Sequence, residues 1–173
     1  MLYIGGVTPP LYDLTPMFHI AEQLPEETVV LCCRPDEWAK AKSAYTQHSS
    51  RNVQVVHAQG SELRDYYQKA DLFLLAWKPY AYLDFAVPYK IFESVANHLP
   101  IVALAGTESA RLILQEGFGW VAKDIPELVA LLKRLRGEPE AIKRKKKQLI
   151  ALAMKHSWLN RARSVADALG QRL

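Results

Sequence analysis

Lys90 and Glu93, two charged residues three positions apart, carry the clearest chemical signal in this sequence of 173 residues. Pro88 precedes them and favours the first turn of a helix, where the missing N–H of proline removes no hydrogen bond. Residues three apart share one face of a helix, so we expect the ammonium and the carboxylate to lie side by side. The alternative is an ordinary exposed ion pair, which stabilises a helix by roughly a few tenths of a kcal/mol.

The surroundings of this pair favour a ligand site. An apolar run at residues 71–77 predicts a strand that precedes the helix. Parallel α/β sheets bind nucleotides where the C-terminal end of a strand meets the start of a helix. The connection between them, residues 78–87, is long and carries Tyr80, Tyr82 and Phe85. Loops at this edge of a sheet are often functional.

Apolar runs and helical patterns alternate along most of the chain. The apolar runs predict strands at residues 2–4, 28–33, 53–57, 71–77, 100–104 and 119–122. The segments between them predict helices at residues 11–24, 35–47, 61–70 and 88–96 and from residue 108, with Ser61 as an N-cap. Further helices are expected at residues 126–136, 139–155 and 158–169.

This alternation predicts an α/β fold, a Rossmann-like three-layer α/β/α arrangement with a six-stranded parallel sheet and C-terminal helices. No repeat or boundary divides the sequence, so we expect a single domain over residues 1–173, with its final helices at about 138–173. Trp120 and Trp158 are expected in the core. His19 falls on an apolar helix face and is expected to be a packed residue rather than a ligand.

The composition favours a globular cytoplasmic protein. Half of the residues are apolar and 23% are charged, and neither a membrane-spanning run nor a signal peptide is recognisable. Cys32 and Cys33 are adjacent and have no other cysteine to pair with, so both are expected to be reduced. No Asp-x-Asp carboxylate cluster is present, so the sequence predicts no metal.

A basic run, Lys143–Lys147, contributes to the net charge of +4. Such a run can contact anionic lipid or nucleic acid, or it can be a solvated helix face. No aromatic residues alternate with these cations to stack on bases, so no nucleic-acid partner is expected. An anionic membrane surface remains an alternative, which would place the protein peripherally at the inner membrane face.

Five segments follow one another in an order found in one enzyme family. They are Tyr3–Gly6, Tyr66–Leu75, Pro88–Glu93 with its following strand, Gly117–Val121 and His156–Trp158. Together they resemble the C-terminal, donor-binding half of a GT-B glycosyltransferase of family 4 (glycosyl transferases group 1). The resemblance covers essentially the whole chain. It implies that the chain is one half of a GT-B fold, which joins two Rossmann-like halves.

The resemblance also implies roles for particular residues. Glu93 would accept hydrogen bonds from the ribose hydroxyls of a nucleotide diphosphate sugar, most often a UDP-sugar. Lys90 would lie near the diphosphate or the sugar. The nucleotide sugar is the substrate, and no resident cofactor is implied. The catalytic residues remain unassigned.

Further donor-binding candidates come from the loops after the strands. Glycine lets the backbone approach phosphates closely, and amides at a helix start can bind phosphate oxygens. The candidates are Gly5 and Gly6 in the first turn, Arg34 after the second strand, and Thr107 and Glu108, whose amides could receive phosphate oxygens. Gly60 and Ser61 are added because their loop resembles the family's uracil-contacting segment.

The sequence departs from the family pattern in two places. Many members have a glutamate eight positions before the ribose glutamate, in contact with the donor sugar; here Phe85 occupies that position, and Asp84 beside it is the substitute candidate. Members also commonly carry an arginine and a lysine after the glycine turn, whereas Val7–Pro10 follow it here. Lys90, Lys78, Arg34 or helix amides would then stabilise the diphosphate.

The resemblance implies a glycosyltransferase that transfers a sugar to a polysaccharide, lipid or other acceptor, as in polysaccharide biosynthesis. This chain alone would be an incomplete and inactive half, because the acceptor binds to the missing N-terminal half. One alternative is a degenerate, non-catalytic module that binds nucleotide or a partner. Another is a nucleotide-sugar epimerase, which would need a base for carbon acidity.

Overall fold

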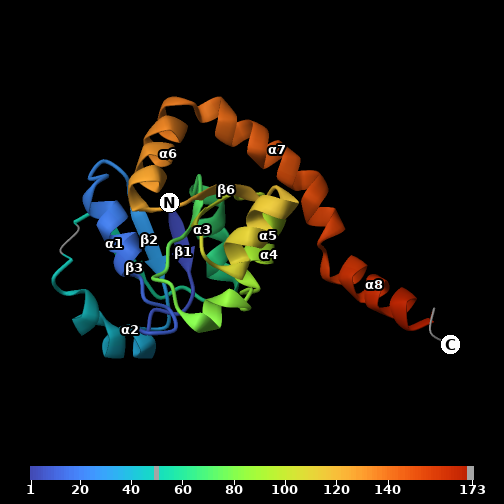
Figure 1. Cartoon of the computed structure of the whole chain (residues 1–173), viewed down its shortest axis with the longest axis horizontal. Coiled ribbons are helices and arrows are strands. Elements are labelled where there is room, and N and C mark those ends of the chain that lie inside the picture. Colours follow the sequence, from blue (N-terminus) through green and yellow to red (C-terminus); the bar gives the residue numbers. More distant parts are fainter. Residues whose placement is uncertain (49–50, 171–173) are drawn as a thin grey trace.

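The structure, a computed structural model, describes residues 1–48 and 51–170. Six strands form one parallel sheet with the spatial order β3-β2-β1-β4-β5-β6, as the alternation predicts (Figure 1). Their bounds are β1 Leu2–Ile4, β2 Val29–Cys32, β3 Val53–Val56, β4 Phe73–Leu75, β5 Ile101–Leu104 and β6 Gly119–Ala122. The four central strands are almost entirely buried, which is why their sequences are apolar throughout.

Helices connect the strands and extend beyond them. They are α1 Thr15–Glu22, α2 Pro35–Ala41, α3 Leu63–Lys69, α4 Lys90–Ala96, α5 Glu108–Glu116, α6 Ile125–Gly137, α7 Pro139–Lys155 and α8 Trp158–Gly170, with 3₁₀ turns η1 Lys42–Tyr45, η2 Gly60–Glu62 and η3 Ala81–Asp84. The chain leaves β1 and β4 in opposite directions, and right-handed crossovers therefore place α1 and α4 on opposite faces of the sheet. Helix α6 packs beside α1, and α7 beside α4.

The strand order reverses between β1 and β4, the two strands at the centre of the sheet. Chains that leave these strands diverge, so a crevice forms beyond their C-terminal ends. At the other side of the sheet, β6 packs very closely on β5. A Cβ on Gly119 would come within 1.7 Å of the Ile101 carbonyl oxygen, so this position requires glycine.

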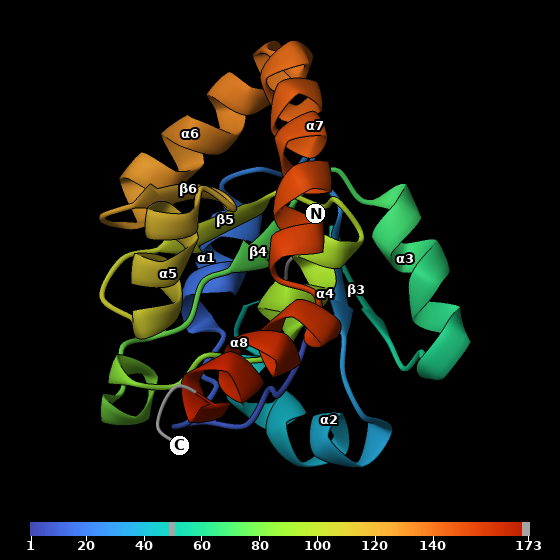
Figure 2. The ribbon, with the colours of Figure 1, turned by 90° about the vertical axis from the view of Figure 1, so that its right-hand side faces the viewer.

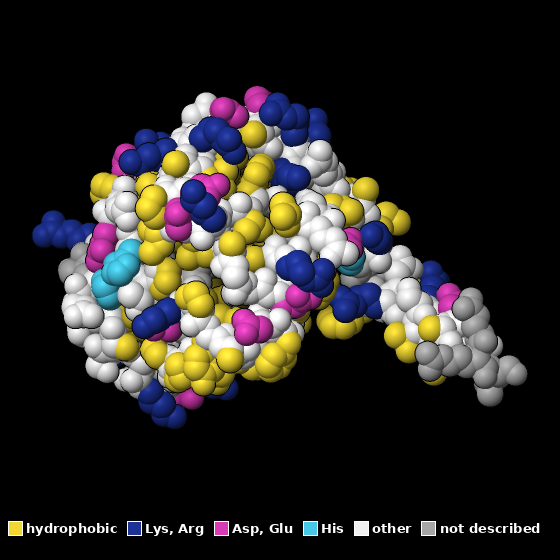
Figure 3. All heavy atoms as spheres, in the orientation of Figure 1, with side chains coloured by type: hydrophobic (Ala, Val, Ile, Leu, Met, Phe, Trp, Pro, Cys, Tyr) yellow, Lys and Arg dark blue, Asp and Glu magenta, His cyan; other side chains and the backbone are white. Residues whose placement is uncertain are grey.

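The basic run packs against the domain through its lysines. Lys145 donates to the carbonyl of Gly117 at 3.3 Å, and Lys146 donates to the carbonyl of Ala70 at 3.2 Å. Leu149 is fully buried on the same helix. Both apolar and polar contacts thus hold α7 in its position across α4. Figure 3 shows Lys and Arg side chains gathered over α6 and α7.

Helix α8 departs from the expectation that its first residue lies in the core. It extends away from the sheet, and none of its residues is buried (Figures 1 and 2). Trp158 is 70% exposed, so its predicted place in the core is wrong. Its sequence has the amphipathic pattern of a covered helix, but within the described residues no surface covers it. No helix in the described part of the chain has the length and apolar character needed to span a membrane.

The predicted N-cap at Ser61 is also wrong. Helix α3 begins two residues later, at Leu63, after the turn η2. The Glu62 carboxylate accepts a hydrogen bond from the Gln59 N–H at 3.1 Å, and the Glu62 N–H donates to the Gln59 carbonyl. The reason is that η2 satisfies the first free amides of this segment before α3 starts, which leaves the Ser61 side chain exposed.

Candidate functional site

A cavity of about 850 Å³ lies at the C-terminal edge of the sheet. The segments that follow β1, β2, β3 and β4 form it, together with the start of α4. The crevice predicted from the strand reversal is therefore open and large enough for a ligand of nucleotide size. Its polar and charged lining residues include Arg34, Glu37, Gln59, Lys90 and Glu93.

Lys90 and Glu93 form the ion pair that their spacing predicts. Lys90 Nζ lies 2.6 Å from Glu93 Oε2, and the side chain of Lys90 is only 14% exposed. The hydroxyl of Tyr67 on α3 donates to the same oxygen at 3.1 Å. Burial and the Glu93 carboxylate raise the pKa of Tyr67, so it stays a donor. Within the described residues, no hydrogen bond to Glu93 Oε1 is present, so this oxygen can accept from a ligand.

Two successive hydrogen bonds fix the position of the glycine turn after β1. The indole N–H of Trp77 donates to the Tyr3 hydroxyl at 3.0 Å, and that hydroxyl donates to the Gly6 carbonyl at 2.5 Å. Burial raises the pKa of Tyr3, which keeps its proton available for this bond. Gly6 lies against Tyr12, since a Cβ on Gly6 would come within 2.4 Å of the Tyr12 ring. The turn is therefore fixed in position where it lines the cavity.

Glu37 on α2 reaches across to the segment after this turn. Its Oε1 accepts from the Val7 N–H at 2.9 Å and from the Thr8 hydroxyl at 3.2 Å. Arg34 Nε lies 3.8 Å from Glu37 Oε2. Both cations that line the cavity, Arg34 and Lys90, thus have a carboxylate neighbour.

Aromatic residues line another part of the cavity. Tyr12 packs edge-on against Tyr82 with ring centroids 6.1 Å apart, and Tyr89 is 55% exposed at the start of α4. Burial and the neighbouring Tyr82 raise the pKa of Tyr12 to about 12, so it is protonated at neutral pH. Aromatic faces with protonated hydroxyls can stack on a base and donate hydrogen bonds to it.

The two adjacent cysteines are free and buried, as expected for reduced thiols. Both line the cavity. Burial raises the pKa of Cys32, and burial and Cys32 together raise the pKa of Cys33 to about 12. Both are therefore protonated at neutral pH and poor nucleophiles.

The structure brings together most of the predicted donor-binding residues. Those that line the cavity are Gly5, Gly6, Arg34, Gly60, Lys90 and Glu93. Ser61 follows Gly60 but does not line it. A separate cavity of about 400 Å³ at the end of β5 is lined by the other three, Asp84, Thr107 and Glu108.

In the second cavity, Thr107 and Glu108 have local partners. The Thr107 hydroxyl accepts from the Ala110 N–H at 3.0 Å and caps α5. The Glu108 carboxylate receives two contacts from Arg111, which lower the pKa of Glu108. Phe85 is 71% exposed and lines neither cavity.

Sequence reasoning missed Glu37, Tyr12 and Tyr67. Glu37 follows Arg34 by three positions in the first turn of a helix that starts at a strand end, the same pattern that identified Lys90 and Glu93. Tyr67 belongs to a segment that carries the family resemblance, but nothing in its spacing points to Glu93. Tyr12 enters the site only because its loop folds back over Gly6.

No protein-family model matches the sequence, and no curated protein matches it. Solved structures share its fold. HepE of Anabaena, solved in complex with UDP, gives a TM-score of 0.76 at 13% identity over 98% of this chain and 48% of HepE. A glycosyltransferase from Rickettsia africae gives 0.71 at 12% identity, over 96% of this chain and 46% of that one.

A third neighbour is a single domain. The C-terminal CMP-Kdo binding domain of WaaA from Acinetobacter baumannii gives a TM-score of 0.51 at 15% identity, over 89% of this chain and 86% of that domain. By fold, the chain belongs among the Rossmann-like α/β domains with a crevice at the strand reversal. More closely, its fold is that of one half of the GT-B architecture, and it matches most of the C-terminal CMP-Kdo binding domain of WaaA. It spans about half the length of HepE and the Rickettsia enzyme.

Proposed function

We propose that the 850 Å³ cavity binds a nucleotide sugar and that the chain is the donor-binding half of a glycosyltransferase. The observation that carries the proposal is the hydrogen bonding of the Glu93 carboxylate. Lys90 and Tyr67 hold one of its carboxylate oxygens, and the other can accept from a ribose hydroxyl. A carboxylate fixed in this way forms stronger hydrogen bonds with a ligand, because its orientation is set before binding.

The expected donor is a UDP-sugar. HepE was solved with UDP, which supports this choice, and the WaaA domain binds CMP-Kdo. The acceptor, a polysaccharide, lipid or other compound, would bind to the missing N-terminal half. Because this half alone lacks a closed cleft that excludes water, we expect it to bind the donor without transferring the sugar.

The exposed face of α8 supports a missing half. Large apolar residues of this helix stand in solvent, namely Trp158, Leu159, Val165 and Leu169. An apolar face of this kind marks an interaction surface. The length of the neighbouring enzymes, about twice that of this chain, supplies a partner that could cover it.

The test is calorimetric titration of the chain with UDP, GDP and ADP, repeated with Glu93→Ala. We expect selective binding of one nucleotide and a loss of roughly 10- to 100-fold in Glu93→Ala, the value of a charge-assisted hydrogen bond or two. Asp65→Ala removes a carboxylate from α3 outside the cavity and is the matched control. Equal affinity in the wild type and Glu93→Ala would contradict the proposal.

A second candidate is a non-catalytic module that binds nucleotide without turnover. The charges of the cavity favour it, because Arg34 and Lys90 already lie beside Glu37 and Glu93. Stabilising a leaving diphosphate needs positive charge that is not already neutralised. Adding the N-terminal half of a glycosyltransferase and measuring transfer separates the two candidates. The epimerase alternative has no comparable support.

A cytoplasmic location at the inner membrane face is the last part of the proposal. Lys143, Arg144 and Lys147 are the exposed cations of the basic run. Since Lys143 is paired with Glu140 at 2.6 Å, Arg144 and Lys147 are the two that support this location. Sedimentation with anionic vesicles should weaken when both are replaced by glutamate. Unchanged sedimentation would contradict a role for this run.

A further inference from the structure

The carboxylate of Glu37 accepts hydrogen bonds from two groups that could otherwise donate to an anionic ligand. The Val7 N–H, directly after the glycine turn, donates to Glu37 Oε1 at 2.9 Å, and the Thr8 hydroxyl donates to the same atom at 3.2 Å. The side chain is only 17% exposed and lines the cavity. A backbone amide beside two glycines at a strand end is a typical partner for a phosphate oxygen. Here a carboxylate of the chain itself takes that place.

The formal charges of the residues that line the cavity also disfavour a diphosphate. Arg34 and Lys90 are the positive lining residues, and Glu37 and Glu93 are the negative ones, so the formal charges sum to zero. A nucleoside diphosphate sugar carries about two negative charges, which such a cavity attracts weakly. One of its phosphates would also meet the negative charge of Glu37 at the turn.

We propose that Glu37 determines which donor the cavity accepts. In this arrangement the carboxylate must leave the turn before a diphosphate can bind there. A ligand with one phosphate or none, such as a nucleoside monophosphate sugar, fits without that displacement. The inference rests on the proposed function, since it presumes that a nucleoside is held by Glu93.

The experiment compares uridine, UMP and UDP by calorimetry in wild type, Glu37→Gln and Asp36→Asn. The glutamine keeps an oxygen that can accept from the Val7 N–H, so the turn should stay folded. We expect Glu37→Gln to bind UDP about tenfold more tightly, the effect of removing one charge roughly 5 Å from a phosphate, and uridine unchanged. Asp36 is the matched control, because it also lies beside Arg34, at 3.7 Å, but is 62% exposed and outside the cavity. Asp36→Asn should change none of the affinities.

The possible outcomes separate this inference from the proposed function. If the ratio of UDP to UMP affinity is the same in wild type and Glu37→Gln, the role of Glu37 is wrong. Uridine binding that is lost in Glu93→Ala would then still support the proposed function. If no ligand binds to any folded variant, both are wrong. Tighter UDP binding in Asp36→Asn of the same size would also overturn the inference, because a general charge effect would then explain the result.

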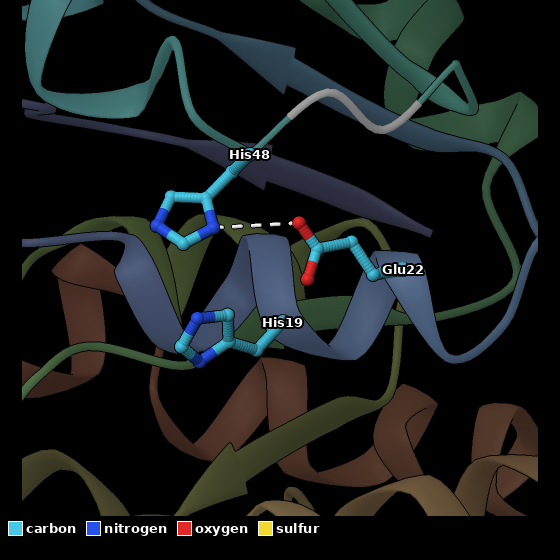
Figure 4. A group of neighbouring side chains, drawn as sticks. All are labelled: His19, Glu22 and His48. Carbon is cyan, nitrogen blue, oxygen red and sulfur yellow. Dashed lines mark hydrogen bonds and ion pairs between the residues drawn. The ribbon is translucent and has the colours of Figure 1, made fainter.

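A cluster of two histidines and a glutamate beside α1 supports a second proposal, which is independent of nucleotide binding. Three potential metal ligands converge on one side of α1 (Figure 4). His19 and Glu22 lie three apart on this helix, and His48 follows η1. Their ligand atoms all lie within 4.8 Å of one another, and the Glu22 Oε1 to His48 Nδ1 distance is 3.3 Å. Two ligands of a tetrahedral zinc ion are about 3.3 Å apart, so this pair is already correctly spaced.

We infer that His19, Glu22 and His48 form a site for a divalent transition metal such as Zn²⁺. Two imidazoles and a carboxylate suit this class of ion, with water in the remaining position. The His19 ring packs edge-on to the His48 ring with centroids 4.7 Å apart, and the exposed Glu22 carboxylate already pairs with His48. The ion would join α1 to the end of η1.

The test is Zn²⁺ titration of the metal-free chain, with binding followed by calorimetry and by thermal unfolding. Micromolar Zn²⁺ should raise the melting temperature, because a ligand of the folded state stabilises it. His19→Ala should weaken binding by at least about tenfold, whereas His57→Ala, outside the cluster, should not. Equal zinc affinity in wild type and His19→Ala would overturn the site.

Discussion

The hydroxyl of Tyr67 on α3 donates to Glu93 on α4 at 3.1 Å, across 26 positions of sequence. This contact joins the helices that precede and follow β4, the strand on one side of the central crevice. Lys90 uses the same carboxylate oxygen. The orientation of the proposed ribose-binding carboxylate is therefore set by two elements rather than one.

Replacing Tyr67 with phenylalanine should weaken nucleotide binding about fivefold, because one hydrogen bond that orients Glu93 is worth about 1 kcal/mol. The fold should persist, since the ring packs in the same place against Phe73. Calorimetric titration with UDP measures the loss. Tyr66→Phe on the same helix is the control, and an equal loss there would contradict the role of Tyr67.

Gly6→Ala should reduce ligand affinity more than it reduces stability. The new Cβ would lie 2.4 Å from the Tyr12 ring, so that ring must move within the cavity. The backbone of Gly6 itself needs no positive φ, so the alanine adds no backbone strain. Binding and chemical denaturation measured on the same variant test this. A large fall in stability with unchanged affinity would show that the glycine serves packing alone.

Gly119→Ala should lower the free energy of unfolding by about 3 kcal/mol or more. Its Cβ would overlap the Ile101 carbonyl oxygen, and the two strands would have to separate. Gly137→Ala at the end of α6 meets no atom within 4 Å and should raise stability by roughly 0.5 kcal/mol. Urea denaturation of both variants gives the comparison. Similar stabilities of the two variants would contradict the close packing of β5 on β6.

Glu116 should make the packing of α7 sensitive to acid. Lys155 at 2.8 Å and His156 at 3.1 Å lower the pKa of Glu116 from its ordinary value of 4.5. A lowered carboxyl pKa contributes stability above about pH 4.5 that is lost as the pH falls through the folded-state pKa.

Comparison with Glu116→Gln isolates this effect. At pH 7 the variant should be less stable by at most about 1 kcal/mol, because Lys155 is largely exposed. The difference between wild type and variant should shrink as the pH falls below 4.5. Thermal melts at several pH values would measure it. A difference that stays constant down to pH 3 would show that the ion pairs contribute nothing.

Much of the fold could be predicted from the sequence because each central strand is buried on both faces. A run such as Phe73–Leu75 is then apolar at every position. The six cavity residues could be predicted for a related reason. In a parallel sheet all strands end at one edge, so loop residues after different strands must meet.

The rest depends on contacts that spacing does not encode. Glu37 reaches Val7 across 30 positions, and His48 reaches Glu22 across 26. The sequence shows neither that His48 returns to α1 nor how its ring meets that of His19. Trp158 was expected in the core, but its apolar side chain does not reveal whether the surface that covers it lies in the same chain.

The position of β1 in the centre of the sheet has a consequence for the order of folding. Strand β1 pairs with β2, about 28 positions later, and also with β4, about 71 positions later. Strands β1 to β3 can assemble while β4 is still being made, but one edge of β1 is then open. Contacts of such long range slow folding and leave strand edges prone to aggregation. We therefore expect refolding yield to depend more on chain concentration than on the final stability of the domain.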